Sequence, residues 1–185
     1  MTDNVLNFPG GTLDLPFIDS SEGENGLGIS SLLSATGNVT LDPGFVNTAS
    51  CTSAITFING EEGILRYRGY PIEQLAEKST FLETSYLLIY GELPTPAQLA
   101  DFESRITQHT MLHEDLRRFF GGFPRDAHPM PVLSSAVSAL STFYQDSLDP
   151  FDQEQVEIST NRLLAKVTTI AAYAYKKSVG QPMLY

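Results

Sequence analysis

Capping and stop residues divide the sequence from Pro71 onward into segments in which apolar residues recur at helical spacing. Prolines stand at first-turn positions, where a missing N–H costs little, and glycines follow the last periodic residues. This punctuation constrains the fold strongly, because each amphipathic segment has to bury one stripe against a neighbour. The predicted helices cover 71–79, 80–93, 95–111, 113–123, 128–145 and 152–178. The sequence therefore predicts a mainly α-helical protein.

Two of these segments make specific predictions. Thr95 is placed to cap a helix whose first residue is Pro96, and Gln98 completes the pattern of a capping box. The segment 80–93 is apolar nearly all round, which is typical of a buried helix, and Gly91 should end it.

The last predicted helix is the longest. Asp152 and Gln155 have the spacing of a capping box, and Gly180 should terminate the helix. Its predicted buried stripe consists of Leu163, Val167, Ile170 and Ala174.

The residues before Pro71 have a different pattern, in which short apolar alternations are separated by turn residues. Residues 1–50 form an acidic, β-rich leader, in which Leu13, Leu15 and Phe17 alternate like one face of a strand. Residues 51–70 predict a β-hairpin, because apolar runs flank a turn containing Asn59 and Gly60. The expected organisation is thus a leader over 1–50, a hairpin over 51–70 and a helical region over 71–185.

Charge limits the classes of partner. The net charge is −11, and no Lys or Arg precedes Arg66. A protein without a basic stripe is a poor partner for nucleic acid or for an acidic membrane, since phosphate neutralisation supplies most of the affinity for both. Small molecules or other protein chains are the expected partners.

Two further features bear on the compartment. Cys51 is the only cysteine, so the chain has no internal disulfide. No apolar run approaches the roughly 18–20 residues that cross a bilayer, and the N-terminus lacks the pattern of a signal peptide. These features favour a cytoplasmic protein.

The stretch QHTMLHED, residues 108–115, holds two of the three histidines. On an unbroken helix, His109 and His113 would share a face with Glu114 nearby and could ligate a metal. The alternative is structural: the apolar stripe of the preceding helix extends onto both histidines, and Thr110 can break the helix between them. The structural interpretation is preferred, and no metal is expected.

Longer stretches resemble a known family. The run DPGFVNTASCTSAITFINGEEGILRYRGYPIEQLAEKSTFLETSYLLIYGELPT, followed by QHTMLHEDLRRFF, DAHPMPVLSSAVSALSTFYQDSLD and RLLAKVTTIAAYAYKKSVGQP, closely resembles the N-terminal part of bacterial citrate synthases of the hexamer-forming branch. The resemblance covers nearly the whole chain beyond its first dozen residues. It implies a citrate synthase-like helical fold, incomplete here, preceded by a small β-rich region. Residues 71–185 would be the truncated N-terminal part of the large domain.

The resemblance also implies an activity. Citrate synthases are acyltransferases that convert the acyl group to alkyl on transfer. They condense acetyl-CoA with oxaloacetate to give citrate and CoA at the entry to the tricarboxylic acid cycle, without a cofactor. The family's catalytic histidines, aspartate and arginines belong to motifs downstream of Tyr185, so no catalytic residue is assigned and the chain alone is expected to be inactive. Whether it is a fragment or a natural truncation stays open. The alternative function is a non-catalytic interaction module or a nucleotide-sensing remnant.

Finally, the resemblance implies an assembly and a regulatory site. The family forms homo-oligomers, dimers or hexamers. Some members are inhibited by NADH at a site remote from catalysis. Its lining corresponds here to His109, Thr110, Met111, Tyr144, Arg162 and Lys166. Gln108 stands where NADH-sensitive members have an arginine, and the loss of that charged donor should weaken phosphate binding.

Overall fold

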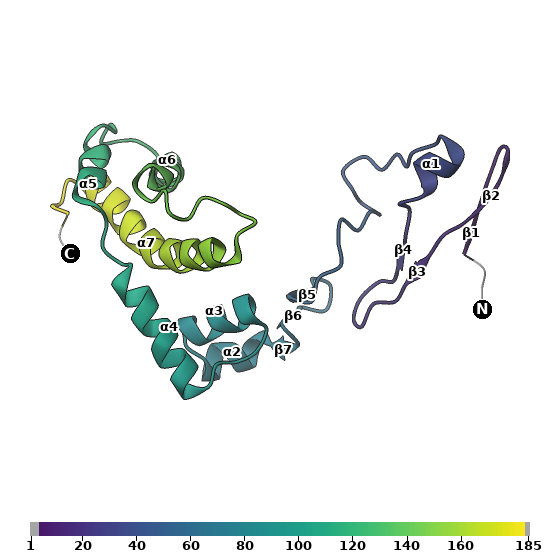
Figure 1. Cartoon of the computed structure of the whole chain (residues 1–185), viewed down its shortest axis with the longest axis horizontal. Helices are drawn as coiled ribbons and strands as arrows, with labels where there is room; N and C mark the ends of the chain where they lie inside the picture. Colours follow the sequence, from purple (N-terminus) through teal and green to yellow (C-terminus); the bar gives the residue numbers. More distant parts are fainter. Residues whose placement is uncertain (1–3, 184–185) are drawn as a thin grey trace. The chain divides into compact units, whose positions relative to one another are not determined.

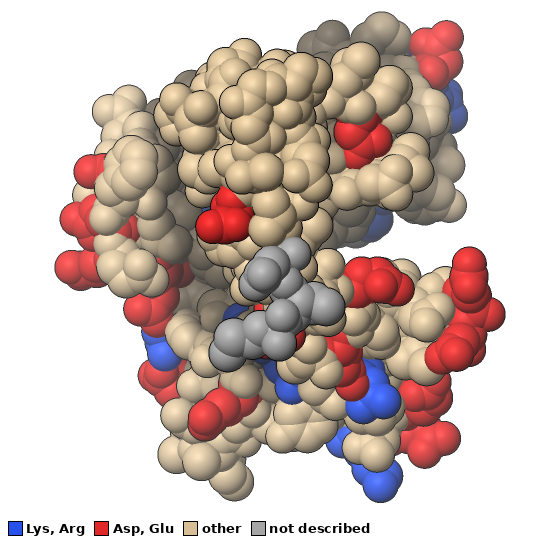
Figure 2. Space-filling model, turned by 90° about the vertical axis from the view of Figure 1, so that its right-hand side faces the viewer, with Lys and Arg blue, Asp and Glu red and all other residues tan. Residues whose placement is uncertain are grey.

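The computed structural model describes residues 4–183, which divide after Leu93 into two compact units, residues 4–93 and residues 94–183 (Figure 1). The chain is mainly helical, as expected, with short strands confined to the first unit. None of the described helices combines the length and the hydropathy that crossing a membrane demands. Figure 2 shows acidic side chains spread over one face with few basic ones among them, in keeping with the net charge of −11.

The first unit begins with two small antiparallel sheets. One pairs β1, Val5–Phe8, with β2, Gly11–Asp14; the other pairs β3, Phe17–Ile18, with β4, Gly26–Leu27. The predicted strand through Leu13, Leu15 and Phe17 is therefore interrupted after Asp14. Pro16 explains the interruption, because proline cannot donate to a strand ladder. The short helix α1, Leu32–Thr36, follows.

The predicted hairpin is confirmed. Strand β5, Thr56–Asn59, pairs antiparallel with β6, Ile64–Tyr67, and β7, Tyr70–Pro71, completes a three-stranded sheet. In the turn, the Asn59 side-chain oxygen accepts hydrogen bonds from the backbone N–H groups of Glu61 and Glu62, both at 3.1 Å. The glycine with positive φ is Gly63, at 70°, rather than Gly60.

Two helices close the first unit: α2, Ile72–Lys78, and α3, Phe81–Tyr90. Thr80 and Glu83 form a capping box at the start of α3, and Gly91 ends it in the left-handed conformation, as predicted. The expectation that α3 is buried is wrong. Only Leu87 is fully enclosed, while Phe81 is 67% exposed. The few elements of this unit cannot cover a helix that is apolar on nearly every side.

The second unit consists of four helices: α4, Pro96–Gln108; α5, Glu114–Gly121; α6, Pro129–Phe143; and α7, Gln153–Val179. Helix α7 packs against the other three (Figure 1). The capping box of Thr95 and Gln98 is present with Pro96 in the first turn, as predicted. The main core lies where α5, α6 and α7 meet and contains Leu112, Leu116, Phe120, Val132, Ala136, Leu140, Ile170, Tyr173 and Ala174.

The buried face of α7 differs from the predicted stripe. Ile170 and Ala174 are buried, but Leu163 and Val167 are 40% and 37% exposed. The buried face includes Arg162 and Lys166 instead. A hydropathy pattern assigns cations to the surface, whereas here both cations have acceptors inside the unit.

The start of α7 also differs in detail. Asp152 accepts hydrogen bonds from the N–H groups of Glu154 and Gln155, which confirms the cap. The reciprocal bond of a capping box is absent, because the Gln155 side-chain oxygen accepts from the N–H of Asp149.

Candidate functional site

The two histidines of the QHTMLHED stretch lie at different helix ends. Helix α4 ends at Gln108 with His109 as its C-cap, and α5 begins after His113 as its N-cap. The continuous helix that a metal-binding pair requires is therefore interrupted between them. Across residues 4–183, no cluster of three or more His, Cys, Asp or Glu has the placement to hold a metal ion. The break itself, residues 109–111, is the feature around which the site is built.

Side chains of α7 hold this break through its backbone. The Lys166 ammonium donates to the carbonyl oxygen of His109 at 2.8 Å and to that of Met111. The Thr169 hydroxyl donates to the intervening carbonyl of Thr110 at 2.9 Å. Three consecutive carbonyls that a helix would have used internally thus find donors on one neighbouring helix. Lys166 is only 2% exposed, so these charge-assisted bonds lie away from water.

Tyr144, the C-cap of α6, places its ring beside both cations of α7. The Arg162 guanidinium carbon lies 4.2 Å from the ring centroid, and the Lys166 nitrogen lies 4.9 Å from it. Both distances are within the range of cation–π attraction. The ring therefore stabilises two like charges that burial alone would disfavour.

Arg162 is paired with a carboxylate on the segment that follows α6. Its two terminal nitrogens donate to the oxygens of Asp146 at 2.8 and 3.1 Å, and one of them also donates to the Ser147 hydroxyl at 2.8 Å. Hydrogen bonding from Arg162 holds the pKa of Asp146 below its ordinary value. Arg162 is 9% exposed, whereas the side chain of Asp146 is largely exposed. The charge of the buried Arg162 is thus neutralised by a carboxylate that is itself exposed to solvent.

His109 is affected by the same charges. Burial lowers the pKa of its imidazole, and Arg162 and Lys166 lower that pKa further by repulsion, while Asp146 acts in the opposite direction. The neutral form is therefore favoured beside the two cations.

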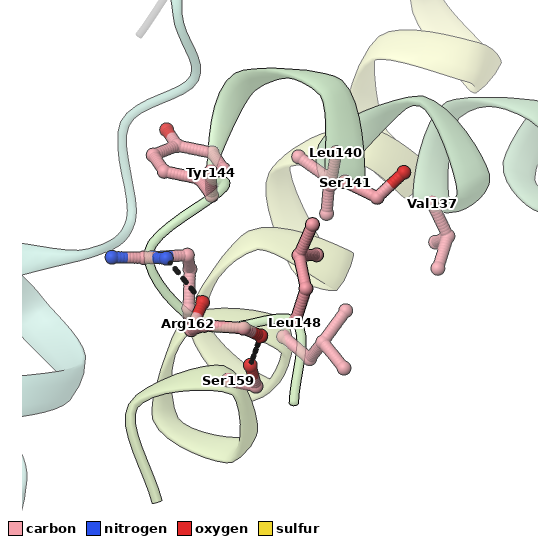
Figure 3. Close-up of a pocket in the computed structure, with 9 residues that line it drawn as sticks. Val137, Leu140, Ser141, Tyr144, Leu148, Ser159 and Arg162 are labelled. Atoms are coloured by element: carbon pink, nitrogen blue, oxygen red, sulfur yellow. Dashed lines mark hydrogen bonds between the residues drawn. The ribbon is translucent and has the colours of Figure 1, made fainter. Parts of the chain in front are cut away.

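A cavity of about 210 Å³ opens beside this cluster (Figure 3). Residues of α6, of the segment after it and of α7 line the cavity: Val137, Leu140, Ser141, Tyr144, Ser147, Leu148, Ser159, Arg162 and Leu163. Figure 3 shows Leu148 on the side of the cavity away from the guanidinium of Arg162. The hydroxyl of Ser159 donates to the carbonyl of Ser147 at 2.6 Å, which ties the wall to α7. The cavity combines an apolar body with one cationic end.

The six residues proposed from the sequence lie in one cluster. Tyr144, Arg162 and Lys166 contribute side chains, whereas His109, Thr110 and Met111 contribute the carbonyls that α7 holds. Gln108 lies just before them and donates to Ser104 on its own helix at 3.3 Å.

Sequence reasoning missed three members of this cluster: Asp146, Ser147 and Thr169. A signal for one of them existed, since Thr169 lies three residues after Lys166 and therefore on the same face of a helix. Nothing in the local pattern links Asp146 to Arg162, sixteen residues away.

Comparisons with known proteins agree with this architecture. A family model described as citrate synthase, C-terminal domain, matches residues 44–185. Citrate synthase 1 of Mycobacterium tuberculosis is 67% identical over 181 residues, which cover 98% of this chain and 42% of that protein. The citrate synthase of Corynebacterium glutamicum is 53% identical over 187 residues, 100% of this chain and 43% of that protein.

A solved structure extends the comparison. The citrate synthase of Pyrobaculum aerophilum matches with a TM-score of 0.67 at 30% identity, over 98% of this chain and 40% of that one. The chain therefore spans less than half the length of the curated relatives that it matches.

Proposed function

The chain belongs to the citrate synthase family, and from this premise we propose that it is the N-terminal part of an enzyme that condenses acetyl-CoA with oxaloacetate to give citrate and CoA. The observation that carries the proposal is 67% identity to a citrate synthase across 98% of the chain. Acetyl-CoA and oxaloacetate are then substrates of the whole enzyme, and no cofactor takes part.

The part played by this chain is structural. Condensation requires a base that removes a proton from the acetyl group and donors that stabilise the developing oxyanion. The three histidines, His109, His113 and His128, instead lie at helix ends, each as a cap residue. The chain therefore contributes packed helices to the enzyme and does not catalyse the reaction alone.

The enzyme is proposed to be a cytoplasmic homo-oligomer, a dimer or a hexamer. Supporting this, large apolar side chains are exposed in both units, including Phe81 on α3 and Phe151 and Tyr175 in the second unit. Exposed apolar side chains are available for packing against the rest of the enzyme and against a second subunit. The net charge of −11 makes nucleic acids and acidic membranes poor partners.

The cluster around Tyr144 is proposed to fix the joint between α4 and α5 onto α7. The Lys166 ammonium donates to two carbonyls and lies beside the ring of Tyr144, and Arg162 is paired with Asp146. A nucleotide such as NADH would have to displace these internal acceptors. The second candidate, an NADH site, is favoured by one observation, the aromatic ring and two cations at the edge of an open cavity.

A chimera tests the catalytic proposal. The matched 181 residues of the Mycobacterium tuberculosis relative are replaced by this chain, and thiol release from acetyl-CoA is followed with and without oxaloacetate. The chimera should release thiol only when oxaloacetate is present. This chain alone and the remainder of the relative alone are the controls, and both should be silent. A chimera that folds and assembles like the relative but releases no thiol would refute the proposal.

A further inference from the structure

Two helices of the second unit begin in the same unusual way, with a histidine side chain as the cap. The Nδ1 atom of His113 accepts the backbone N–H of Asp115 at 3.1 Å, and the Nδ1 atom of His128 accepts that of Met130 at 3.2 Å. The two caps share one backbone conformation, with φ and ψ of −60° and 139° at His113 and −61° and 134° at His128. The same device thus starts both α5 and α6.

The chemistry of imidazole makes these caps conditional. Nδ1 accepts a hydrogen bond only when it carries no proton, so both rings must hold their proton on Nε2. Protonation of Nδ1 turns the acceptor into a donor that faces another N–H. It also places a positive charge at a helix N-terminus, where the helix dipole repels it. Serine, threonine, aspartate or asparagine, the usual caps, would not lose their function near neutral pH.

Among the described residues, few ion pairs involve the two capping histidines or their neighbours. An oxygen of Asp115, on α5, lies 3.8 Å from Nδ1 of His113, and Asp115 is itself paired with Arg118 at 3.1 Å. Glu114 is paired with Arg117 at 3.1 Å. From α6, the ring of Phe143 contacts His113 at a centroid distance of 5.0 Å and contributes no charge. No ion pair with His128 occurs among residues 4–183, where the salt bridges are described. The two caps thus differ in their charged neighbours, since among the described residues a carboxylate lies beside the first and no ion-pair partner lies beside the second.

Both caps hold the same core. Leu116, in the first turn of α5, and Val132, in the first turn of α6, are buried in the cluster that these helices share with α7. His113 also joins the two helices directly, because its ring packs on Phe143 at the far end of α6. Loss of the caps would therefore loosen two helix starts in one core.

We propose that His113 and His128 form a pair of acid-sensitive caps that hold the starts of α5 and α6 while their Nδ1 atoms are unprotonated and release them when the imidazoles are protonated. His109 is not part of this pair, because it caps the end of α4 and its side chain accepts no helix N–H.

The first test uses the unaltered chain. Nitrogen-15 NMR of the imidazoles at pH 7.5 should show His113 and His128 as Nε2–H tautomers, and the amides of Asp115 and Met130 should be protected from exchange. Protection at both amides, corrected for the intrinsic rate, should fall as the pH is lowered to 5.5. An Nδ1–H tautomer at either ring, or protection independent of pH, would overturn the proposal.

The second test is the double variant His113→Asn, His128→Asn, in which the caps remain but do not titrate. Between pH 7.5 and pH 5.5 the melting temperature of the unaltered chain should fall by about 4–8 °C more than that of the variant, taking about 1 kcal/mol per cap. His109 is present in both proteins, so its contribution to the fall in melting temperature cancels in the comparison. Equal falls would overturn the proposal, and the NMR test decides independently if the variant does not fold.

Discussion

The interaction that should matter most to the second unit is the one between Lys166 and the break after α4. We predict that Lys166→Met destabilises the chain severely, although methionine keeps most of the apolar stem. The substitution removes two charge-assisted hydrogen bonds, those to the carbonyls of His109 and Met111, and the cation beside the ring of Tyr144. The Thr169 bond to Thr110 remains.

The magnitude follows from what each change costs. Hydrogen bonds to charged groups contribute about 1.5–3 kcal/mol each, and a carbonyl left dry costs about 1–3 kcal/mol. Against this, the variant no longer desolvates an ammonium group that is 98% buried by residue area, which recovers part of the loss. The net loss in the free energy of unfolding should be about 2–4 kcal/mol.

Urea unfolding followed by circular dichroism measures this loss. With a slope of about 2 kcal/mol per molar urea, in the middle of the usual range, the midpoint should fall by about 1–2 M. Lys177→Met is the matched control, since Lys177 lies in the last turn of the same helix and should contribute only about 0.3–1 kcal/mol through the helix dipole. If Lys166→Met costs no more than Lys177→Met, the ammonium does not hold the break and the structural role proposed for the cluster is wrong.

Three further predictions concern neighbouring features. Asp146→Asn should lower the free energy of unfolding at pH 7, because it leaves the buried Arg162 without its carboxylate. The hydrogen bond from Arg162 lowers the pKa of Asp146, so this stabilisation is present above about pH 4 and is lost as the pH falls through the lowered value. Unfolding curves of the two proteins should therefore converge in acid. Gly180→Ala should cost about 1–2 kcal/mol and lower the melting temperature by several degrees. The reasons are that Gly180 has a φ of 71° and that an added Cβ would lie 2.7 Å from the Arg125 guanidinium. The control is Gly121→Ala, where an added Cβ meets nothing within 4 Å, and its melting temperature should be nearly unchanged. In the chimera, Gln108→Arg should strengthen NADH inhibition if the cluster is a nucleotide site, by supplying a charge-assisted donor beside His109, and superimposable inhibition curves would eliminate that candidate.

Local chemistry in the sequence was sufficient to place most element boundaries. Thr95, Pro96 and Gln98 specify the start of α4 because a capping box needs only residues within one turn. The hairpin of β5 and β6 is specified equally locally, by apolar runs on either side of a short turn. These features depend on neighbours in the chain and not on tertiary contacts.

Burial was harder to predict, because it depends on distant partners. Leu163 and Val167 fit a buried stripe by spacing, yet Arg162 and Lys166 occupy the buried face because Asp146 and the carbonyls after α4 accept their hydrogen bonds. The break between α4 and α5 was one of two open interpretations for the same reason. Its stability depends on Lys166 of α7, which follows it by more than fifty residues.

The contacts within the candidate site were also hard to predict from the sequence. Its members were proposed through the family resemblance, and the structure places them together, yet the resemblance did not indicate that three of them act through their carbonyls. Asp146 was missed because no spacing rule relates it to Arg162.

The dependence of the break on α7 has a consequence for the order of events during synthesis. The bonds from Lys166 and Thr169 span 57, 55 and 59 residues. At about 5–20 residues per second, a ribosome needs roughly 3–12 s to add that many. During this interval the carbonyls of residues 109–111 lack the donors of Lys166 and Thr169, so no contact from α7 fixes the angle between α4 and α5. The angle between α4 and α5 is therefore fixed late in synthesis, once α7 has been made and packs against residues 109–111.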